Sequence, residues 1–186
     1  MGRRLVCRVG VIEVSATSLG LLVVRVVAGV VFAGHGAQKA FGWWSGPGFA
    51  GWRGAMERMN MRPASFWAAV STAAELGGGI LLALGLLTPV ATAALVGQTV
   101  VIVFLVHLPK GFWNAKGGIE YPLTLGAIAL AVTATGPGSV SLDAALRLSY
   151  PPEVRPVVFV LGVIGGLVAL AIPRMAPQQA AAPQPR

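Results

Sequence analysis

Apolar positions fall into five runs that are separated by short polar segments, at residues 18–36, 66–87, 89–106, 119–135 and 156–172. At a rise of about 1.5 Å per residue, each run is long enough, or nearly so, to cross a hydrocarbon layer about 30 Å thick. The second and third runs are joined by little more than Thr88 and Pro89, and proline is tolerated at the first position of a helix. We therefore predict an all-α membrane protein with five spans, of which the second and third form a tight antiparallel hairpin.

The segments outside these runs predict smaller features. Between the first two runs, Phe49, Trp52, Met56 and Met59 share one side of a helical projection, which favours a short helix lying in the membrane interface. An ordinary aromatic loop is the simpler alternative. Residues 1–17 form a basic flank that we expect to be retained, because no good small-residue cleavage site follows. Residues 173–186 are rich in Pro, Gln and Ala and are expected to be disordered.

Composition supports the membrane assignment and excludes several functions. Of the 186 residues, 55% are apolar and 11% are charged, whereas a soluble domain has about a quarter charged residues. We expect anionic lipid headgroups to be the partner of the protein's net charge of +8, and we expect no nucleic-acid partner. A single cysteine, Cys7, excludes a dithiol, an iron–sulfur cluster or a cysteine-based zinc site within one chain. Two histidines are too few for a protein metal cage without carboxylate help, so we predict no metal.

Two charged residues lie inside the apolar runs and need an explanation. Arg25 lies in the first run, where an arginine at the bilayer centre costs at least about 2.5–3.5 kcal/mol on insertion scales. Glu75 lies in the second run, and counting residues from the run ends puts the two side chains at similar depth. Gln98 reaches the same level in the third run. We predict a mid-membrane Arg25–Glu75 ion pair, which either locks two helices together or binds a ligand.

Glycines accompany these charges on the same helix faces. Gly29, Gly36 and Lys39 fall on the Arg25 side of the first span, and Gly79 follows Glu75 by one turn. Glycines let a second helix or a flat ligand approach the backbone closely. The sequence therefore predicts that either a second helix or a planar ligand lies close against this stripe, and a ligand that enters the bundle would fit at Gly29 and Gly36.

A second polar cluster is expected at one membrane face. The first and third spans run in the same direction and end near His35 with Lys39 and near His107, while the fourth span begins at that face with Glu120. The opposite hairpin, residues 84–89, carries no charge. Histidines and a carboxylate can exchange protons with a quinol, whereas their spacing fits no zinc or haem signature.

Four stretches together resemble the DoxX family of small bacterial membrane proteins. They are RxxxGxxFxxHGxxK from Arg25 to Lys39, ELGGGILLALGL from Glu75 to Leu86, GIE ending at Glu120, and GPGSVSLD ending at Asp143. The resemblance covers residues 18–147 and implies an antiparallel four-helix transmembrane bundle. Residues 148–172 then form a linker and an additional C-terminal transmembrane helix. The resemblance singles out Arg25, Gly36, Lys39, Glu75, Gly79, Glu120 and Asp143; we assign Asp143, with Gly29, a structural role.

What the resemblance implies about function is a membrane location and a link to redox chemistry. Some members look like small subunits of thiosulfate:quinone oxidoreductase or of a terminal quinol oxidase. Our first hypothesis is a non-autonomous oxidoreductase subunit in a bacterial plasma membrane, with electrons supplied by a partner protein and a quinone or small sulfur compound bound in the bundle. Its candidate residues for ligand binding or proton exchange are Arg25, His35, Gly36, Lys39, Glu75, Gly79, Gln98, His107 and Glu120. A non-catalytic scaffold that recruits soluble redox enzymes and a small transporter remain the alternatives.

Overall fold

The structure is a computed structural model that describes residues 15–175, with side chains described as far as Ala171. Within that range the chain forms helices and no strands, which confirms the predicted all-α class. The five long helices are α1 (Ala16–Phe41), α3 (Ala64–Leu84), α4 (Thr88–Ile102), α5 (Glu120–Thr135) and α7 (Val154–Met175). Two shorter helices, α2 (Gly48–Arg58) and α6 (Leu142–Ala145), lie between them. A π-helix, Val103–His107, continues α4.

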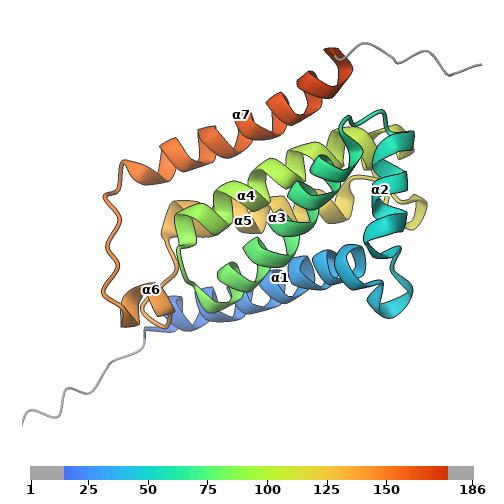
Figure 1. Cartoon of the computed structure of the whole chain (residues 1–186). Coiled ribbons are helices and arrows are strands. Elements are labelled where there is room, and N and C mark those ends of the chain that lie inside the picture. Colours follow the sequence, from blue (N-terminus) through green and yellow to red (C-terminus); the bar gives the residue numbers. More distant parts are fainter. Residues whose placement is uncertain (1–14, 176–186) are drawn as a thin grey trace, which may run out of the picture.

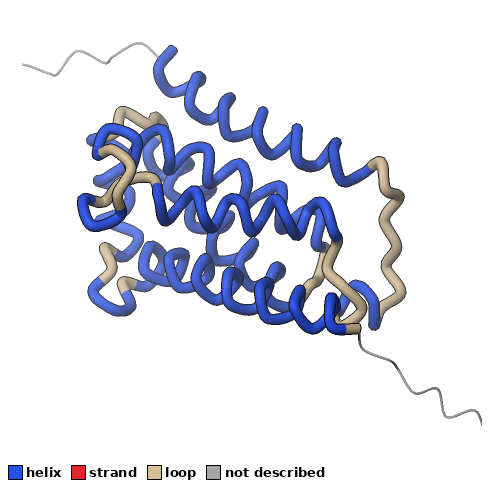
Figure 2. Tube along the Cα trace, turned by 180° about the vertical axis from the view of Figure 1, so that it is seen from behind, coloured by secondary structure: helices blue, strands red, loops and turns tan. Residues whose placement is uncertain are grey.

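The long helices run side by side in alternating directions, with α7 on the outside of the bundle against α4 (Figures 1 and 2). Helix α2 lies at one end of the bundle and α6 at the other (Figure 1). We call these the α2 end, where α1 finishes and α3 and α5 begin, and the α6 end, where α4 and α7 begin. Most of the predicted N-terminal flank and of the predicted tail lies outside the described residues, although α7 continues through Met175.

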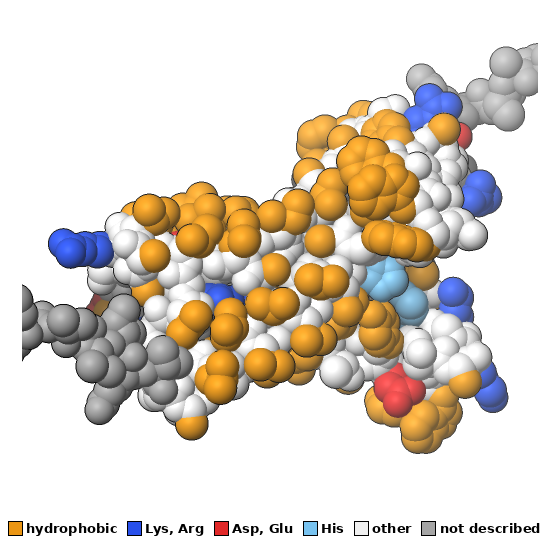
Figure 3. Space-filling view, turned by 90° about the horizontal axis from the view of Figure 1, so that it is seen from below, with side chains coloured by type: hydrophobic (Ala, Val, Ile, Leu, Met, Phe, Trp, Pro, Cys, Tyr) orange, Lys and Arg blue, Asp and Glu red, His pale blue; other side chains and the backbone are white. Residues whose placement is uncertain are grey.

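Four helical segments are long and apolar enough to cross a membrane: α1, α3, α4 with its extension to Lys110, and α7. Large apolar side chains on their outer faces are exposed, including Val27 and Val30 of α1 and Val160 and Ile164 of α7. Apolar side chains likewise cover much of the face shown in Figure 3. Such a surface is stable in lipid rather than in water. The chain is therefore a multi-pass membrane protein.

Glycines set the closest helix contacts. A Cβ atom at Gly29 would lie 2.6 Å from the carbonyl oxygen of Gly79 on α3, and one at Gly36 would overlap the backbone of Leu76. Gly79 in turn faces Ala33 of α1. Of the two alternatives for Gly29, Gly36 and Gly79, the structure has the second helix, and the opposite helix leaves no space there for a ligand.

Candidate functional site

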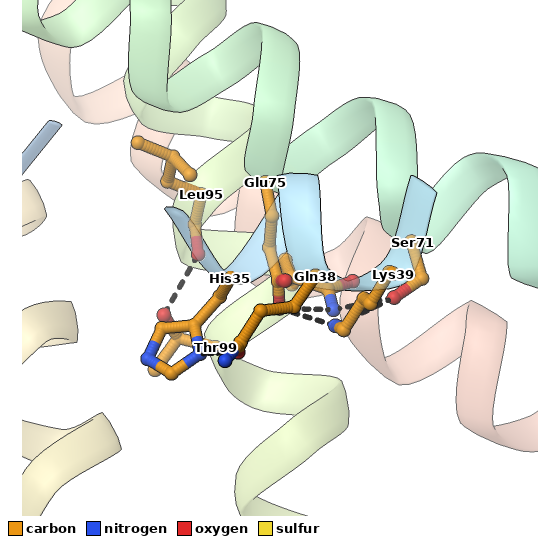
Figure 4. Close-up of polar contacts among 8 residues, drawn as sticks. His35, Gln38, Lys39, Ser71, Glu75, Leu95 and Thr99 are labelled. Carbon is orange, nitrogen blue, oxygen red and sulfur yellow. Dashed lines mark hydrogen bonds and ion pairs between the residues drawn. The ribbon is translucent and has the colours of Figure 1, made fainter. Parts of the chain in front are cut away.

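A buried polar network joins α1, α3 and α4 near the α2 end (Figure 4). The Lys39 Nζ donates to Glu75 Oε1 at 2.6 Å and to Ser71 Oγ at 3.2 Å. The Gln98 Nε2 donates to the same two oxygens, at 3.0 Å and 2.8 Å. Glu75, Ser71 and Gln98 are all more than nine-tenths buried. The counter-charge of Glu75 is therefore Lys39, which also donates to the Ser71 hydroxyl, while the Gln98 amide donates to Glu75 and Ser71.

A cavity of about 210 Å³ adjoins this network. Its walls come from α1, α4 with its π-helical extension, and α5, and Trp52 of α2 and Glu75 of α3 contribute to the same lining. The Lys39 Nζ lies 4.2 Å from the centre of the Trp52 ring, within the range of a cation–π contact. The lining residues are Phe32, His35, Lys39, Trp52, Glu75, Ile102, Val106, His107, Tyr121, Pro122 and Leu125. Charged, aromatic and apolar groups thus surround one space.

Both histidines of the chain reach this cavity. His107 Nδ1 lies 2.7 Å from the carbonyl oxygen of Gly117, so a neutral ring donates from Nδ1 and keeps Nε2 as an acceptor. His35 packs edge to face against Tyr121, with ring centres 5.9 Å apart. Figure 3 shows histidine side chains at the surface of the α2 end, beside a hollow. The predicted convergence of His35, Lys39 and His107 at one face is confirmed.

Two polar atoms at this site are buried without a hydrogen-bond partner among the described residues. They are Glu75 Oε2 and Trp52 Nε1. A buried carboxylate oxygen is an acceptor and an indole N–H is a donor. Leaving a buried polar group without a hydrogen-bond partner costs about 1–3 kcal/mol, and the cost is higher when the group is charged. Both residues line the cavity, and each has one hydrogen-bonding group that no described residue satisfies.

The family model for DoxX matches residues 20–108, from the first turns of α1 to the end of the α4 extension. Through these residues the chain belongs to the DoxX family. The matched region contains Lys39, Glu75, Gln98 and His107, whereas Glu120 and Asp143 lie beyond it. No curated protein and no solved structure matches the chain.

The DoxX bundle does not contain the predicted Arg25–Glu75 pair. Arg25 lies at the α6 end, where its guanidinium donates to the carbonyl oxygens of Pro137 at 2.9 Å and Val140 at 2.6 Å. Since Gly29 faces Ala83 and Gly36 faces Leu76, the residues opposite Arg25 are those near Leu87 rather than Glu75. The depth estimate was wrong by about 18 Å, or twelve residues at 1.5 Å each, because the end of α1 and the start of α3 are not at the same level.

Asp143 organises the α6 end of the DoxX protein, in keeping with its predicted structural role. Its carboxylate accepts from the backbone N–H groups of Leu87 and Thr88, at 2.8 Å and 3.0 Å, and from the Thr88 hydroxyl at 2.6 Å. It also accepts from the Tyr150 hydroxyl at 3.2 Å. Burial and the neighbouring Asp143 charge raise the pKa of Tyr150. The 84–89 hairpin, which has no charge of its own, is therefore held by a carboxylate from elsewhere in the chain.

Other candidates in the DoxX chain lie outside the cavity lining. Glu120 is at the α2 end, but its Oε2 accepts from the backbone N–H of Asn114 at 2.9 Å. Gly36 and Gly79 serve helix packing, as described above. Within the described residues no group of three or more His, Cys, Asp or Glu side chains could hold a metal ion.

The sequence did not single out three residues that the structure adds to the site. Ser71 bridges Lys39 and Gln98, Trp52 packs over Lys39, and Tyr121 lines the cavity. Ser71 precedes Glu75 by one helical turn, so helical spacing could have identified it. Nothing in the local sequence indicates that Trp52 packs over Lys39.

Proposed function

We propose that this DoxX protein is a membrane subunit of a bacterial redox system and that its cavity binds a hydroquinone-type ring. The observation that carries the proposal is that two cavity-lining residues, Glu75 and Trp52, each hold a buried polar atom, Oε2 and Nε1, with no hydrogen-bond partner among the described residues. A hydroquinone O–H group can donate to the carboxylate and also accept from the indole N–H. Apolar lining groups such as Phe32 and Leu125 suit the ring faces.

The same residues fit the proton chemistry of such a ligand. Conversion of a hydroquinone to its quinone releases two protons and two electrons. The Glu75 carboxylate is placed to take one proton, and the free Nε2 of His107 is a candidate acceptor for the other. The two electrons pass to a redox partner protein, since the sequence contains no dithiol and no evident flavin or haem motif.

A small sulfur oxyanion is less well matched to this cavity. The nearest cation, Lys39, is already paired with Glu75 at 2.6 Å. A buried dianion such as thiosulfate would need further positive charge, because burying an unpaired charge is costly. The neutral ring of a hydroquinone avoids that cost.

The proposal is tested by thermal unfolding of the purified protein with and without trimethylhydroquinone, under anaerobic conditions. A ligand that binds only the folded state raises the unfolding temperature. We expect stabilisation of the parent protein and roughly ten- to hundredfold weaker binding by Glu75→Gln, which removes a hydrogen bond to a charged group. Glu120→Gln is the matched control, because Glu120 lies at the same end outside the cavity lining, and it should bind as the parent does.

Two results would overturn the proposal. No stabilisation of the parent by hydroquinones would remove the cavity as their binding site. Equal stabilisation of the parent and of Glu75→Gln would place the ligand elsewhere in the protein.

A further inference from the structure

A second, larger cavity lies on the opposite side of the Glu75 network. It has a volume of about 360 Å³ and runs between α3, α4 and α7, with Met56 and Met61 from the α2 region at its end. Helix α7 packs on α4 through Gly97, Gly162 and Gly166, and a Cβ atom at Gly166 would lie 2.6 Å from the Gly97 carbonyl oxygen. We call this cavity the α3–α7 groove. Its volume falls within the usual range of ligand pockets, about 300–1,000 Å³.

The wall of the α3–α7 groove contains two buried polar side chains, Ser71 and Gln98. Both amide hydrogens of Gln98 are used, since its Nε2 donates to Ser71 Oγ and to Glu75 Oε1. A carboxylate oxygen only accepts, so the amide nitrogen must face Glu75 and the amide oxygen must point elsewhere. No hydrogen bond to this Gln98 oxygen is found within residues 15–175.

Ser71, in contrast, can still donate a hydrogen bond. Its hydroxyl oxygen accepts from Lys39 Nζ and from Gln98 Nε2, which can only donate. Its own hydrogen therefore remains available, and no acceptor for it is found in the described part of the chain. The groove wall thus offers one donor, from Ser71, and one acceptor, from Gln98.

The remaining lining determines what can occupy this place. The described lining residues are small or apolar, chiefly Ala, Gly, Val, Leu and Met, and none is charged. Ser71 lies seven residues into α3, about 10 Å from its start at 1.5 Å per residue. A phosphate headgroup would be buried there without a cation of its own, because the nearby Lys39 is already paired with Glu75, and such burial is unfavourable. A hydroxyl group, in contrast, both donates and accepts one hydrogen bond, as these two side chains require.

We propose that the α3–α7 groove is a binding site for an uncharged lipid that carries a hydroxyl head on an alkyl or isoprenoid chain. The hydroxyl lies between Ser71 Oγ and Gln98 Oε1, and the chain lies along the small residues of α4 and α7. This site is separate from the cavity of the proposed function, although Ser71 and Gln98 contribute to the wall between them.

The test compares two probes that differ only in the hydroxyl group. Farnesol and its methyl ether are added to the protein in phosphatidylcholine nanodiscs, whose lipid carries no hydroxyl, and thermal unfolding is measured. The ether oxygen accepts but cannot donate to Gln98. We expect farnesol to bind about two- to tenfold more tightly than the ether, the ratio expected for one hydrogen bond.

Matched glycine variants locate the site. Gly165 lines the groove and a Cβ atom there would meet nothing within 4 Å, so Gly165→Leu fills the groove without strain. Gly77 of α3 is equally open but does not line the groove, and Gly77→Leu is the control. Farnesol stabilisation should be lost in Gly165→Leu and retained in Gly77→Leu.

Three outcomes would overturn this inference. Equal stabilisation by farnesol and its ether would indicate a site for any hydrocarbon chain. Farnesol stabilisation that survives Gly165→Leu would place the lipid elsewhere. If neither probe stabilises the parent while Gly165→Leu converts a dimer into a monomer, the groove is a contact between two copies. Because the hydroquinone test depends on Glu75 rather than on Gly165, either proposal can fail without the other.

Discussion

Replacing Glu75 by alanine should leave Lys39 as a charge without a counter-ion in a largely buried place. The Lys39 side chain is 11% exposed and its Nζ lies 2.6 Å from Glu75 Oε1. Breaking a buried pair by removing one partner costs about 3–5 kcal/mol. About 1 kcal/mol of this reflects the hydrogen bond from Gln98, which loses one of its two acceptors and keeps Ser71 Oγ.

A second substitution then identifies the true partner of Glu75. Lys39→Met removes the uncompensated charge, and we expect it to recover at least about 2 kcal/mol of the loss caused by Glu75→Ala. Arg25→Met should recover nothing, because Arg25 lies about 21 Å away from Lys39 along α1, at 1.5 Å per residue. In the double variant, the destabilisation caused by Arg25→Met should add to that caused by Glu75→Ala within about 0.5 kcal/mol, as expected for independent sites.

The measurement is the free energy of unfolding in mixed micelles with increasing dodecyl sulfate, followed by circular dichroism. Glu57→Ala is the control, because Glu57 is half exposed and lies 3.8 Å from Arg53 in a surface pair. Such a pair contributes at most about 0.5 kcal/mol. Rescue of Glu75→Ala by Arg25→Met would refute the assignment of Lys39, and so would a Glu75→Ala protein as stable as Glu57→Ala.

Two further predictions concern helix packing and the α6 end. Gly36→Ala should lower the free energy of unfolding by about 1–3 kcal/mol, because the methyl group of the new alanine would overlap α3. Gly20→Ala, at an open position, should leave the free energy of unfolding unchanged. Equal stabilities of the two variants would contradict the α1–α3 packing. In spectrophotometric titration, Tyr150 should ionise above the ordinary tyrosine pKa of about 10, and Asp143→Asn should move its ionisation to lower pH. Because folding raises this pKa, its contribution to stability is complete below about pH 10 and is lost as pH rises through the folded-state value, and Tyr150→Phe should lack this loss. Ionisation of Tyr150 at the ordinary pH would contradict the Asp143 contact.

The long helices were predictable because lipid imposes a strict requirement on length and apolarity. Their ends were less so. Helix α1 continues to Phe41, five residues past the predicted limit, because Gln38 and Lys39 find polar partners at the α2 end. Gly42, in a left-handed conformation with a φ of 75°, ends the helix. The glycine was visible in the sequence, but counting apolar residues alone placed the end too early.

The error about Arg25 has the same origin. Depth was counted from the ends of apolar runs, whereas the register between α1 and α3 is fixed by glycine contacts such as Gly29 with Ala83. The partners of Arg25 are the backbone carbonyls of Pro137 and Val140, more than a hundred residues away. Residue type and spacing do not encode a contact between a helix and the backbone of a distant loop.

Two buried carboxylates of this protein differ in how their oxygens are hydrogen bonded. Asp143 is 1% exposed and both of its oxygens accept hydrogen bonds, from Leu87, Thr88 and Tyr150. Glu75 is 3% exposed and lines the cavity, yet among the described residues only its Oε1 is hydrogen bonded and its Oε2 has no partner. Burial alone does not distinguish them, because both are deep in the protein. The unmatched oxygen of Glu75 distinguishes them. A carboxylate whose oxygens are both hydrogen bonded has no remaining capacity for a ligand. When one oxygen has no partner, a molecule that enters the cavity can gain the free energy of the missing hydrogen bond.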